Sequence, residues 1–255
     1  MGDEDDDVDN RVLGRSDLGV LGGGGTGIGR AIAARIAAEG DAVLITGRRA
    51  EPLQETADKL GQRVRYVVCD GADPVAVDEL RTELPDTVDV LVNNAGGNTE
   101  FDRAPAADLQ ALAASWRANL EANLVSAVLM TEIVRDRLTD PAVVISIASI
   151  AADKGAGAYG AAKAGLASWN IGLARALGTR GVTANIVSPG FIADAEFFRD
   201  KLTNAPRDLL IAATHTKRPG TPNDIAHTGW FLASPAARQI TGQVLAVNGG
   251  EHPSR

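Results

Sequence analysis

The 255-residue sequence contains one cysteine and three histidines, and it has no long hydrophobic run. The single cysteine, Cys69, cannot form a disulfide within the chain, which fits the reducing cytoplasm in which we expect the protein. His215, His227 and His252 lack the spacing of metal ligands, so we expect no metal site. No apolar run approaches the length that spans a bilayer, and the acidic start lacks the apolar segment of a signal peptide.

An excess of basic residues is also missing. The formal net charge is −8, and six of the acidic residues lie within the first ten positions. We therefore expect an acidic, disordered tail over residues 1–15 and a nearly neutral folded domain over residues 16–255. Because no basic patch suited to phosphates is evident, we expect neither nucleic acid nor a membrane as a partner.

Short apolar runs alternate with helical patterns along the folded domain. Ile28, Ile32 and Ile36 share one face of an expected helix over residues 27–39. The expected strands cover residues 18–21, 42–45, 64–68, 88–92, 142–147, 182–187 and 243–247. This alternation predicts an α/β fold, a single doubly wound Rossmann-type domain with a seven-stranded parallel sheet flanked by helices. Residues 194–217 interrupt the alternation and predict a helical flap beyond the carboxyl ends of the strands, where such folds bind ligands.

A glycine-rich turn joins the first expected strand to the first expected helix, with the sequence Gly22-Gly23-Gly24-Gly25-Thr26-Gly27-Ile28-Gly29. Glycines let the backbone turn tightly and approach a ligand, and the free N–H groups of a helix N-terminus suit a pyrophosphate. Alone, such a turn also fits a loop without a ligand. The strand before it and the helix after it favour a dinucleotide, and the missing Lys-Ser/Thr ending disfavours a nucleoside triphosphatase.

Several motifs, taken in order, resemble those of the short-chain dehydrogenase/reductase family, and in particular its 3-oxoacyl-ACP reductase-like members. They are Gly23-x-x-x-Gly27-Ile28-Gly29, Asn93-Asn94-Ala95-Gly96, Tyr159-Gly160-Ala161-Ala162-Lys163, Pro189-Gly190, and an ending that runs from Ile240-Thr241-Gly242 to Asn248-Gly249-Gly250. The resemblance covers nearly the whole folded domain. It implies an NAD(P)-dependent oxidoreductase, such as a carbonyl reductase, that acts on a small-molecule carbonyl or alcohol.

Tyr159 and Lys163 lie four residues apart in an expected helix over residues 158–177, so their side chains share a face. A tyrosine titrates near pH ~10 and a nearby ammonium lowers its pKa, so we expect Lys163 to activate Tyr159. For the pair alone, packing and a solvated charge are the simpler interpretation; the other motifs favour catalysis. The resemblance implies that Tyr159 exchanges a proton with the substrate oxygen and that Lys163 also binds the nicotinamide ribose.

The resemblance further implies a serine that holds the substrate oxygen and an asparagine that positions a water in the proton relay. The family's serine comes just after the strand, which points to Ser149 as our first choice, with Ser146 the second. The segment from Ser149 to Tyr159 is shorter than in many family members. Asn123 fits the register of the family's helix motif, so we choose it over Asn119, which we expect at the surface or at a cap.

The cofactor type depends on the residues after the second expected strand. NAD-preferring members usually carry an acid there that binds the ribose 2′-hydroxyl, whereas this chain has Gly47, Arg48 and Arg49. Because arginine pairs with a 2′-phosphate, we expect NADP, with NAD as the alternative. The expected cofactor-binding residues are Gly23, Thr26, Gly27, Ile28, Gly29, Arg48, Asp70, Asn94, Ala95, Gly96, Tyr159, Lys163, Pro189, Gly190 and Ile192.

Two positions depart from the family pattern. Gly22 replaces a threonine that usually ties the glycine turn to a neighbouring strand, and Ala195 stands near another usual threonine. Both departures predict weaker cofactor binding, and they keep open a different class of function, a dinucleotide-binding sensor or scaffold without turnover. Because family members commonly assemble through two long helices, and residues 161–177 are rich in small side chains, we expect a homotetramer or homodimer.

Overall fold

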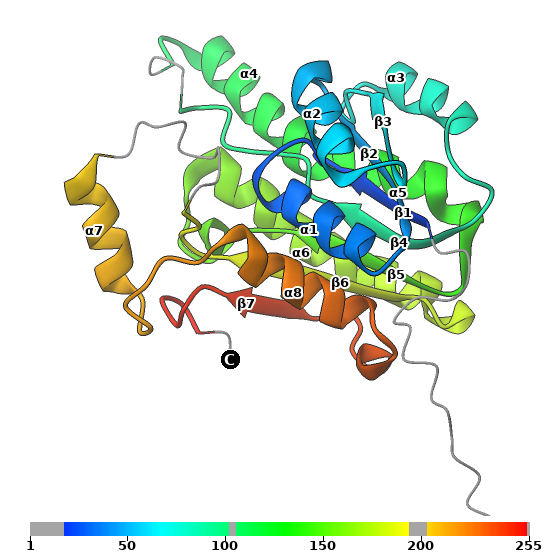
Figure 1. The fold of residues 1–255 in the computed structure, drawn as a ribbon. Helices are drawn as coiled ribbons and strands as arrows, with labels where there is room; N and C mark the ends of the chain where they lie inside the picture. Colours follow the sequence, from blue (N-terminus) through cyan, green and yellow to red (C-terminus); the bar gives the residue numbers. More distant parts are fainter. Residues whose placement is uncertain (1–17, 102–105, 194–202, 254–255) are drawn as a thin grey trace, which may run out of the picture.

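The computed structural model describes residues 18–101, 106–193 and 203–253. Its centre is a seven-stranded sheet in which every strand is parallel to its neighbours, in the order β3-β2-β1-β4-β5-β6-β7 (Figure 1). The strands are β1 (Leu18–Gly22), β2 (Ala42–Gly47), β3 (Val64–Val68), β4 (Val88–Asn93), β5 (Leu138–Ile147), β6 (Thr183–Pro189) and β7 (Val244–Val247). This confirms the predicted fold class. The strand order reverses between β1 and β4, which is the point where such sheets bind ligands.

Helices cover both faces of the sheet (Figure 1). On one face, buried apolar residues of the sheet pack against α1 (Gly27–Ala38), α2 (Ala50–Leu60) and α8 (Pro222–Ala233). On the other face they pack against α3 (Pro74–Glu79), α5 (Ser126–Val134) and α6 (Gly157–Leu177). The remaining long helix on this side, α4 (Leu109–Leu120), packs against α6. Two-sided cover explains why the central strands are continuous apolar runs.

Short helical turns connect several of these elements. The 3-10 turns are η1 (Leu80–Thr82), η3 (Arg135–Arg137), η4 (Ile150–Ala152), η5 (Gly178–Arg180) and η7 (Pro235–Ala237). A π-helical turn, η2 (Glu121–Val125), joins α4 to α5. Single π turns inside helices are frequent at functional sites, and this one contains Asn123.

The described elements follow the sequence patterns closely, with one informative difference. β5 begins at Leu138, whereas the apolar run predicted a strand from residue 142. Leu138 pairs with Val88, and the register then shifts before Val90 pairs with Val143. Pro141 lies in this interval and has no N–H to donate, so the strand reaches further than its apolar run only through an irregular segment.

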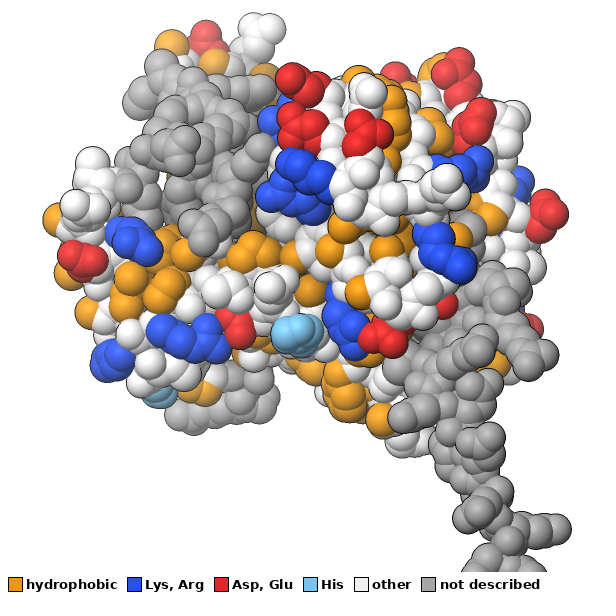
Figure 2. Space-filling view, in the orientation of Figure 1, with side chains coloured by type: hydrophobic (Ala, Val, Ile, Leu, Met, Phe, Trp, Pro, Cys, Tyr) orange, Lys and Arg blue, Asp and Glu red, His pale blue; other side chains and the backbone are white. Residues whose placement is uncertain are grey.

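The described part of the predicted flap contains α7 (Asn204–Ala213), which stands beyond the carboxyl ends of the strands (Figure 1). None of the residues of α7 is buried. Ala195 and the first part of the flap lie outside the described residues. On the face shown in Figure 2, acidic and basic side chains are interspersed among the described residues, and hydrophobic side chains form a band towards the side of α7.

Candidate active site

The glycine turn after β1 holds two stretches of backbone in close contact. The N–H groups of Gly23 and Gly24 donate to the carbonyl oxygen of Thr46 at the end of β2, at 2.8 and 3.1 Å. A Cβ atom on Gly29 would lie 2.0 Å from the carbonyl oxygen of Gly23, which no side chain permits. Gly23 and Gly27 also have φ angles of 72° and 50°, which favour glycine. The turn is therefore a bare backbone surface at the start of α1 and fits a pyrophosphate.

Thr26 and Ile28, the other residues expected to bind the cofactor in this turn, lie at the start of α1. Thr26 is the N-cap residue of α1, so the helix begins within the motif. Ile28 is half-buried and packs on the core, which anchors the first turn of α1 to the sheet. The backbone that would meet the phosphates is thereby fixed on both sides.

Gly22 leaves room at the end of β1 where the family pattern has threonine. A Cβ atom there would lie 3.8 Å from the carbonyl oxygen of Val92 and 3.9 Å from the nitrogen of Ala95. Asn94 provides a connection in its place, because its Nδ2 donates to the carbonyl oxygen of Gly23 at 3.0 Å. This hydrogen bond ties the glycine turn to Asn94, the residue that directly follows β4.

Arg48 and Asp70 follow adjacent strand ends. The N–H of Cys69, just after β3, donates to the carbonyl oxygen of Gly47 at the end of β2, at 2.9 Å. Arg48 and Asp70, the residues that follow these two, therefore lie side by side. Both side chains are exposed. The structure therefore brings Arg48, expected beside the 2′-phosphate, and Asp70, also expected to bind the cofactor, to the same corner of the sheet.

Asn123 lies within the π turn and is almost fully buried. Its Oδ1 accepts the N–H of Gly97 at 2.9 Å, and its Nδ2 donates to the carbonyl oxygens of Gly97 and Asn119, both at 3.0 Å. A Cβ on Gly96 would lie 2.4 Å from Oδ1 of Asn123. The Asn94-Ala95-Gly96 segment can therefore pack against Asn123 only because Gly96 has no side chain. Asn123 is held against the loop that follows β4.

Our expectation for Asn119 is wrong, because this residue is neither at the surface nor a cap. Its side chain is fully buried, its Oδ1 accepts the N–H of Thr99 at 3.3 Å, and its Nδ2 donates to the carbonyl oxygen of Ser115. Asn119 and Asn123 are four residues apart and lie on the same side of the helix, so both bind the loop after β4. The four-residue spacing was the available signal for this paired role.

The two candidate serines occupy different environments. Ser149 is the N-cap of η4, where its Oγ accepts the N–H of Ala151 at 3.2 Å, and its side chain is also hydrogen-bonded to Tyr159. Ser146 is fully buried in β5, where it accepts a long hydrogen bond of 3.4 Å from Nδ2 of Asn93. The structure therefore joins Ser149, and not Ser146, to the tyrosine.

Tyr159 and Lys163 lie on the buried side of α6, one turn apart. The Nζ atom of Lys163 lies 5.9 Å from the centroid of the Tyr159 ring. It donates to the carbonyl oxygen of Ile147, the last residue of β5, at 2.7 Å. Lys163 thereby connects α6 to the strand end that leads to Ser149.

Burial determines the proton affinities of this pair. It raises the pKa of Tyr159 to about 12, against a smaller lowering by the hydrogen bond with Ser149. It lowers the pKa of Lys163 to about 8. The spacing in the sequence predicted the opposite direction for the pKa of the phenol, and that prediction is wrong, because desolvation of the phenolate dominates this pKa.

Three of the expected cofactor-binding residues, Pro189, Gly190 and Ile192, lie at or just after the end of β6. Pro189 ends the strand, and a Cβ on Gly190 would lie 2.7 Å from the Cβ of Asn248, so Gly190 permits a close contact with the C-terminal segment. Ile192 is buried and pairs with Gly220 in an isolated parallel bridge. The two ends of the flap therefore meet at this edge of the sheet.

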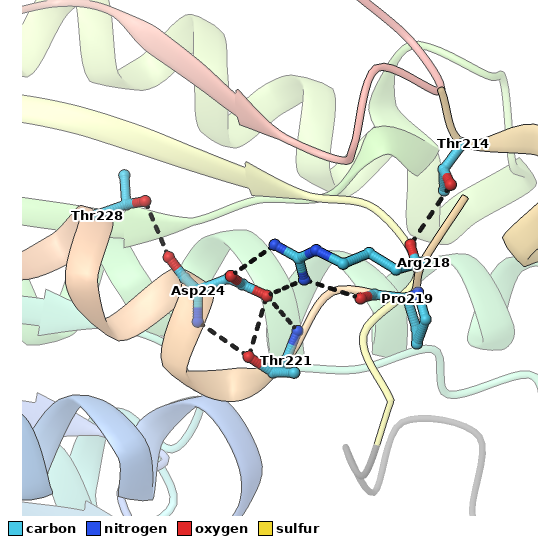
Figure 3. Close-up of polar contacts among 6 residues, drawn as sticks. All are labelled: Thr214, Arg218, Pro219, Thr221, Asp224 and Thr228. Carbon is cyan, nitrogen blue, oxygen red and sulfur yellow. Dashed lines mark hydrogen bonds and ion pairs between the residues drawn. The ribbon is translucent and has the colours of Figure 1, made fainter. Parts of the chain in front are cut away.

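An ion pair anchors the exit of the flap to α8 (Figure 3). Arg218 binds both carboxylate oxygens of Asp224, at 2.8 and 3.0 Å, and holds the pKa of that carboxyl well below its usual range. Thr221 and Asp224 also form a capping box at the start of α8. A two-point pair within a capping network has a defined geometry, so the chain leaves the flap in a fixed direction.

Sequence reasoning missed several side chains that shape the site. Asn93 donates from Nδ2 to the hydroxyl of Thr131 at 3.0 Å, which ties the end of β4 to α5. A Cβ on Gly160 would lie 2.5 Å from the carbonyl oxygen of Ala151, so η4 packs directly on the helix that carries Tyr159. Gly160 stands inside the Tyr-x-x-x-Lys motif, but a motif gives no signal of this contact.

Two kinds of feature are absent from the described part of the chain. No group of three or more histidine, cysteine, aspartate or glutamate side chains there could hold a metal ion. None of the helices described is long and apolar enough to cross a membrane.

A parallel sheet with a glycine turn at its switch point, and a serine, tyrosine and lysine at the neighbouring strand end, defines a dinucleotide-dependent enzyme of the Rossmann type. Residues 23–252 match the model of a protein family described as enoyl-(acyl carrier protein) reductase. The chain is 34% identical over 242 residues to the 3-oxoacyl-[acyl-carrier-protein] reductase FabG of Escherichia coli (strain K12), covering 91% of this chain and 96% of that protein. It is 35% identical to nodulation protein G of Rhizobium sp. (strain N33), covering 89% and 94%.

Solved structures agree with these relatives. A short-chain dehydrogenase from Burkholderia cenocepacia J2315 in complex with NADP is 31% identical, with a TM-score of 0.82 and coverage of 95% of this chain and 99% of that one. A 7α-hydroxysteroid dehydrogenase with NADH and 7-oxo glycochenodeoxycholic acid is 28% identical, with a TM-score of 0.84 and coverage of 94% and 95%. The chain belongs to the short-chain dehydrogenase/reductase family and is an NAD(P)-dependent oxidoreductase.

Proposed function

We propose that the enzyme transfers a hydride reversibly between NADP(H) and a carbonyl or secondary alcohol, with Tyr159 as the proton donor and acceptor. The observation that carries this proposal is the hydrogen bond between Ser149 and Tyr159, with Lys163 one helical turn away at the end of β5. The glycine turn fits the cofactor because Gly23 and Gly29, where a Cβ would collide with Ala95 and with the Gly23 carbonyl, let its backbone fold tightly at the start of α1. When bound, the nicotinamide supplies or accepts the hydride.

The residues of the chain handle the substrate oxygen and its proton. Ser149 and Tyr159 hold that oxygen by hydrogen bonds, and Tyr159 gives it a proton as the carbonyl carbon is reduced. The resulting phenolate is stabilised by the ammonium of Lys163, and Asn123 positions the water through which it regains a proton. In the oxidation of an alcohol the same proton moves back to Tyr159.

The protonation state of Tyr159 suits the reductive direction, in which the phenol gives a proton to the substrate oxygen. With a pKa of about 12, the phenol keeps its proton at neutral pH, as a proton donor must. Oxidation first requires the phenolate, which burial disfavours. We therefore propose a carbonyl reductase, and we retain an NAD-dependent secondary alcohol dehydrogenase as the alternative.

Replacing the phenol tests this assignment. A Tyr159→Phe variant is expected still to bind NADPH and to lose roughly a hundred-fold or more in kcat on a panel of ketones. Tyr66→Phe is the matched control, because Tyr66 is the other tyrosine of the sequence and lies exposed on β3. Turnover retained by Tyr159→Phe contradicts the proposal, and NADPH binding by a wild-type protein that reduces none of the ketones favours a sensor.

The choice of NADP over NAD rests on the position of Arg48 beside the glycine turn. An Arg48→Asp variant is expected to weaken NADPH binding by roughly ten-fold or more, because a charge-assisted contact to the 2′-phosphate is lost. Arg63→Asp makes the same change of charge at the opposite end of β2, where the carbonyl of residue 63 binds Val43. Equal effects of the two variants in fluorescence titrations would contradict the assignment of Arg48.

We further propose that the enzyme is a homotetramer or homodimer of the cytoplasm. Leu109, Leu112 and Trp116 form an exposed apolar stripe on α4, and Ile171 is exposed on α6, which packs against α4. A stripe of this kind suits burial against a second copy. Light scattering measures the mass, and a value near that of the 26.4 kDa chain contradicts assembly.

A further inference from the structure

One ion pair connects the segment between Ser149 and Tyr159 to the end of the described chain. The Nζ atom of Lys154 lies 2.5 Å from Oε1 of Glu251, although the two residues are 97 positions apart. The side chain of Lys154 is 47% exposed, whereas that of Glu251 is only 5% exposed. A nearly buried carboxylate thus faces a cation that reaches it from the active-site segment.

The burial of Glu251 makes this contact more than a surface ion pair. An exposed pair contributes little, because both charges keep their water. Removal of one partner of a buried charge leaves the other uncompensated, which is strongly unfavourable. The structure shows Lys154 as the cation beside Glu251, so the carboxylate holds the lysine, and the segment with it, in place.

The turn that carries Glu251 is itself firmly held. Oδ1 of Asn248 accepts the N–H of Gly250 at 3.0 Å, and the N–H of Glu251 donates to the carbonyl oxygen of Asn248 at 3.2 Å. The carbonyl oxygen of Gly249 accepts the N–H of His215 at 2.8 Å, which adds the exit of the flap to the same cluster. Glu251 therefore offers Lys154 a fixed point of attachment.

The segment on the lysine side is short, and the backbone hydrogen bonds at its middle are local ones: the N–H groups of Asp153 and Lys154 both donate to the carbonyl oxygen of Ile150, at 3.1 Å. It forms η4 directly after Ser149, turns through Gly155 and Gly157, whose φ angles are 68° and 55°, and enters α6 two residues before Tyr159. Lys154 occupies the centre of this turn. A displacement at Lys154 moves the chain on which Ser149 caps η4, and so changes the contact between Ser149 and Tyr159.

We propose that Lys154 and Glu251 are a positioning pair that keeps the hydroxyl of Ser149 within hydrogen-bond distance of the hydroxyl of Tyr159. This inference rests on the proposed function, in which those two hydroxyls share the substrate oxygen. The pair acts through the segment that it fixes, and neither residue is proposed to touch the substrate or the cofactor. It should therefore affect kcat and leave the affinity for NADPH unchanged.

The kinetic test compares Lys154→Met, Glu251→Gln and the exchanged pair Lys154→Glu/Glu251→Lys. Lys154→Met is expected to lower kcat by about ten-fold through misalignment, with the Kd of NADPH unchanged. The exchanged pair is expected to regain most of the lost kcat. Lys59→Met is the matched control, because Lys59 pairs with Glu55 on the exposed surface of α2 and its loss should change nothing. Unchanged kcat in Lys154→Met, or no recovery in a folded exchanged pair, overturns the proposal.

A second readout is independent of turnover and separates this inference from the proposed function. The sequence has two tyrosines, so incorporation of 3-fluorotyrosine gives two ¹⁹F signals, which Tyr66→Phe assigns. Ser149→Ala provides the signal of Tyr159 without its serine partner. Lys154→Met should move the Tyr159 signal towards that reference, and the exchanged pair should move it back. If these shifts occur in a protein that reduces no carbonyl, the proposed function fails and the positioning role stands; an unmoved signal rejects the positioning role.

Discussion

Single residues at the glycine turn decide how firmly the cofactor site is built. Gly22 leaves a gap beside the carbonyl of Val92 and the nitrogen of Ala95, and Asn94 is the connection from β4 that remains. A Gly22→Thr variant is expected to bind NADPH about five-fold more tightly, because its hydroxyl adds one hydrogen bond between the turn and β4. The φ angle of Gly22 is not positive, so the substitution introduces no backbone strain.

Gly22→Val is the control for this prediction. Valine has the shape of threonine without its hydroxyl, so it fills the same gap and restricts the backbone equally. Fluorescence titration with NADPH measures both variants. If valine tightens binding as much as threonine, the effect comes from backbone restriction, and the hydrogen bond is not responsible.

At the scale of single residues, the sequence predicted which side chains share a helix face better than it predicted how deeply those side chains are buried. The spacing of Tyr159 and Lys163 places them on one helix face, and the choice of Ser149 over Ser146 agrees with the hydrogen bond that the structure contains. The direction of the tyrosine pKa could not be predicted, because it depends on how deeply α6 buries the phenol. The same is true of Asn119, whose burial depends on the course of the loop after β4.

Packing between elements sets the distance from η4 to α6. A Cβ on Gly160 would meet the carbonyl oxygen of Ala151 at 2.5 Å, which is too close for any side chain. Gly160→Ala is therefore expected to push η4 away from the helix and to lower kcat by about ten-fold or more, as Ser149 moves away from Tyr159. Steady-state kinetics with a ketone and NADPH measure the loss.

Gly172 provides a matched control in the same helix. A Cβ there meets nothing within 4 Å, so Gly172→Ala should leave kcat unchanged and stabilise the protein by up to about 1 kcal/mol through helix propensity. Urea unfolding measures this gain. Equal kinetic effects of the two variants would show that loss of helix flexibility, and not the contact with η4, limits the enzyme.

Element positions were largely predictable, whereas their irregularities were not. Each of the seven apolar runs became a strand, and the helix expected over residues 27–39 is α1. The π turn that holds Asn123 has no local pattern, because it arises from the fit of α4 and α5 around the loop after β4. The ion pair of Lys154 and Glu251 joins distant parts of the chain, and no periodicity reports such a contact.

For the whole molecule, alternation alone was sufficient to predict the architecture. Buried apolar runs between helical patterns can form a parallel sheet only when helices cover both of its faces, and right-handed connections then leave few strand orders. The position of the site follows from the same rule, because the seven strands are parallel and all their carboxyl ends lie on one side of the sheet. The alternation does not predict the free energy of folding, because this free energy also depends on the charges that the fold buries.

The buried ammonium of Lys163 should make stability depend on pH. Its pKa falls from an ordinary value of 10.5 to about 8 in the folded protein, so between these values the unfolded chain binds more protons than the native one. Stability therefore rises with pH in this window, and below pH 8 the buried charge costs about 3 kcal/mol. Tyr159, with its raised pKa, acts in the opposite sense only above pH 10.

Comparison with Lys163→Met isolates this contribution from the other titrating groups. Methionine fills the same space without a charge, so the variant should gain stability relative to the wild type at pH 7, less the hydrogen bond to Ile147. The difference in unfolding free energy between the two proteins should then change in favour of the wild type as the pH rises from 8 to 10. Urea denaturation at a series of pH values measures it. A difference that stays constant over that range would mean that the lysine keeps its ordinary pKa, through water or a partner that reaches it at the end of β5.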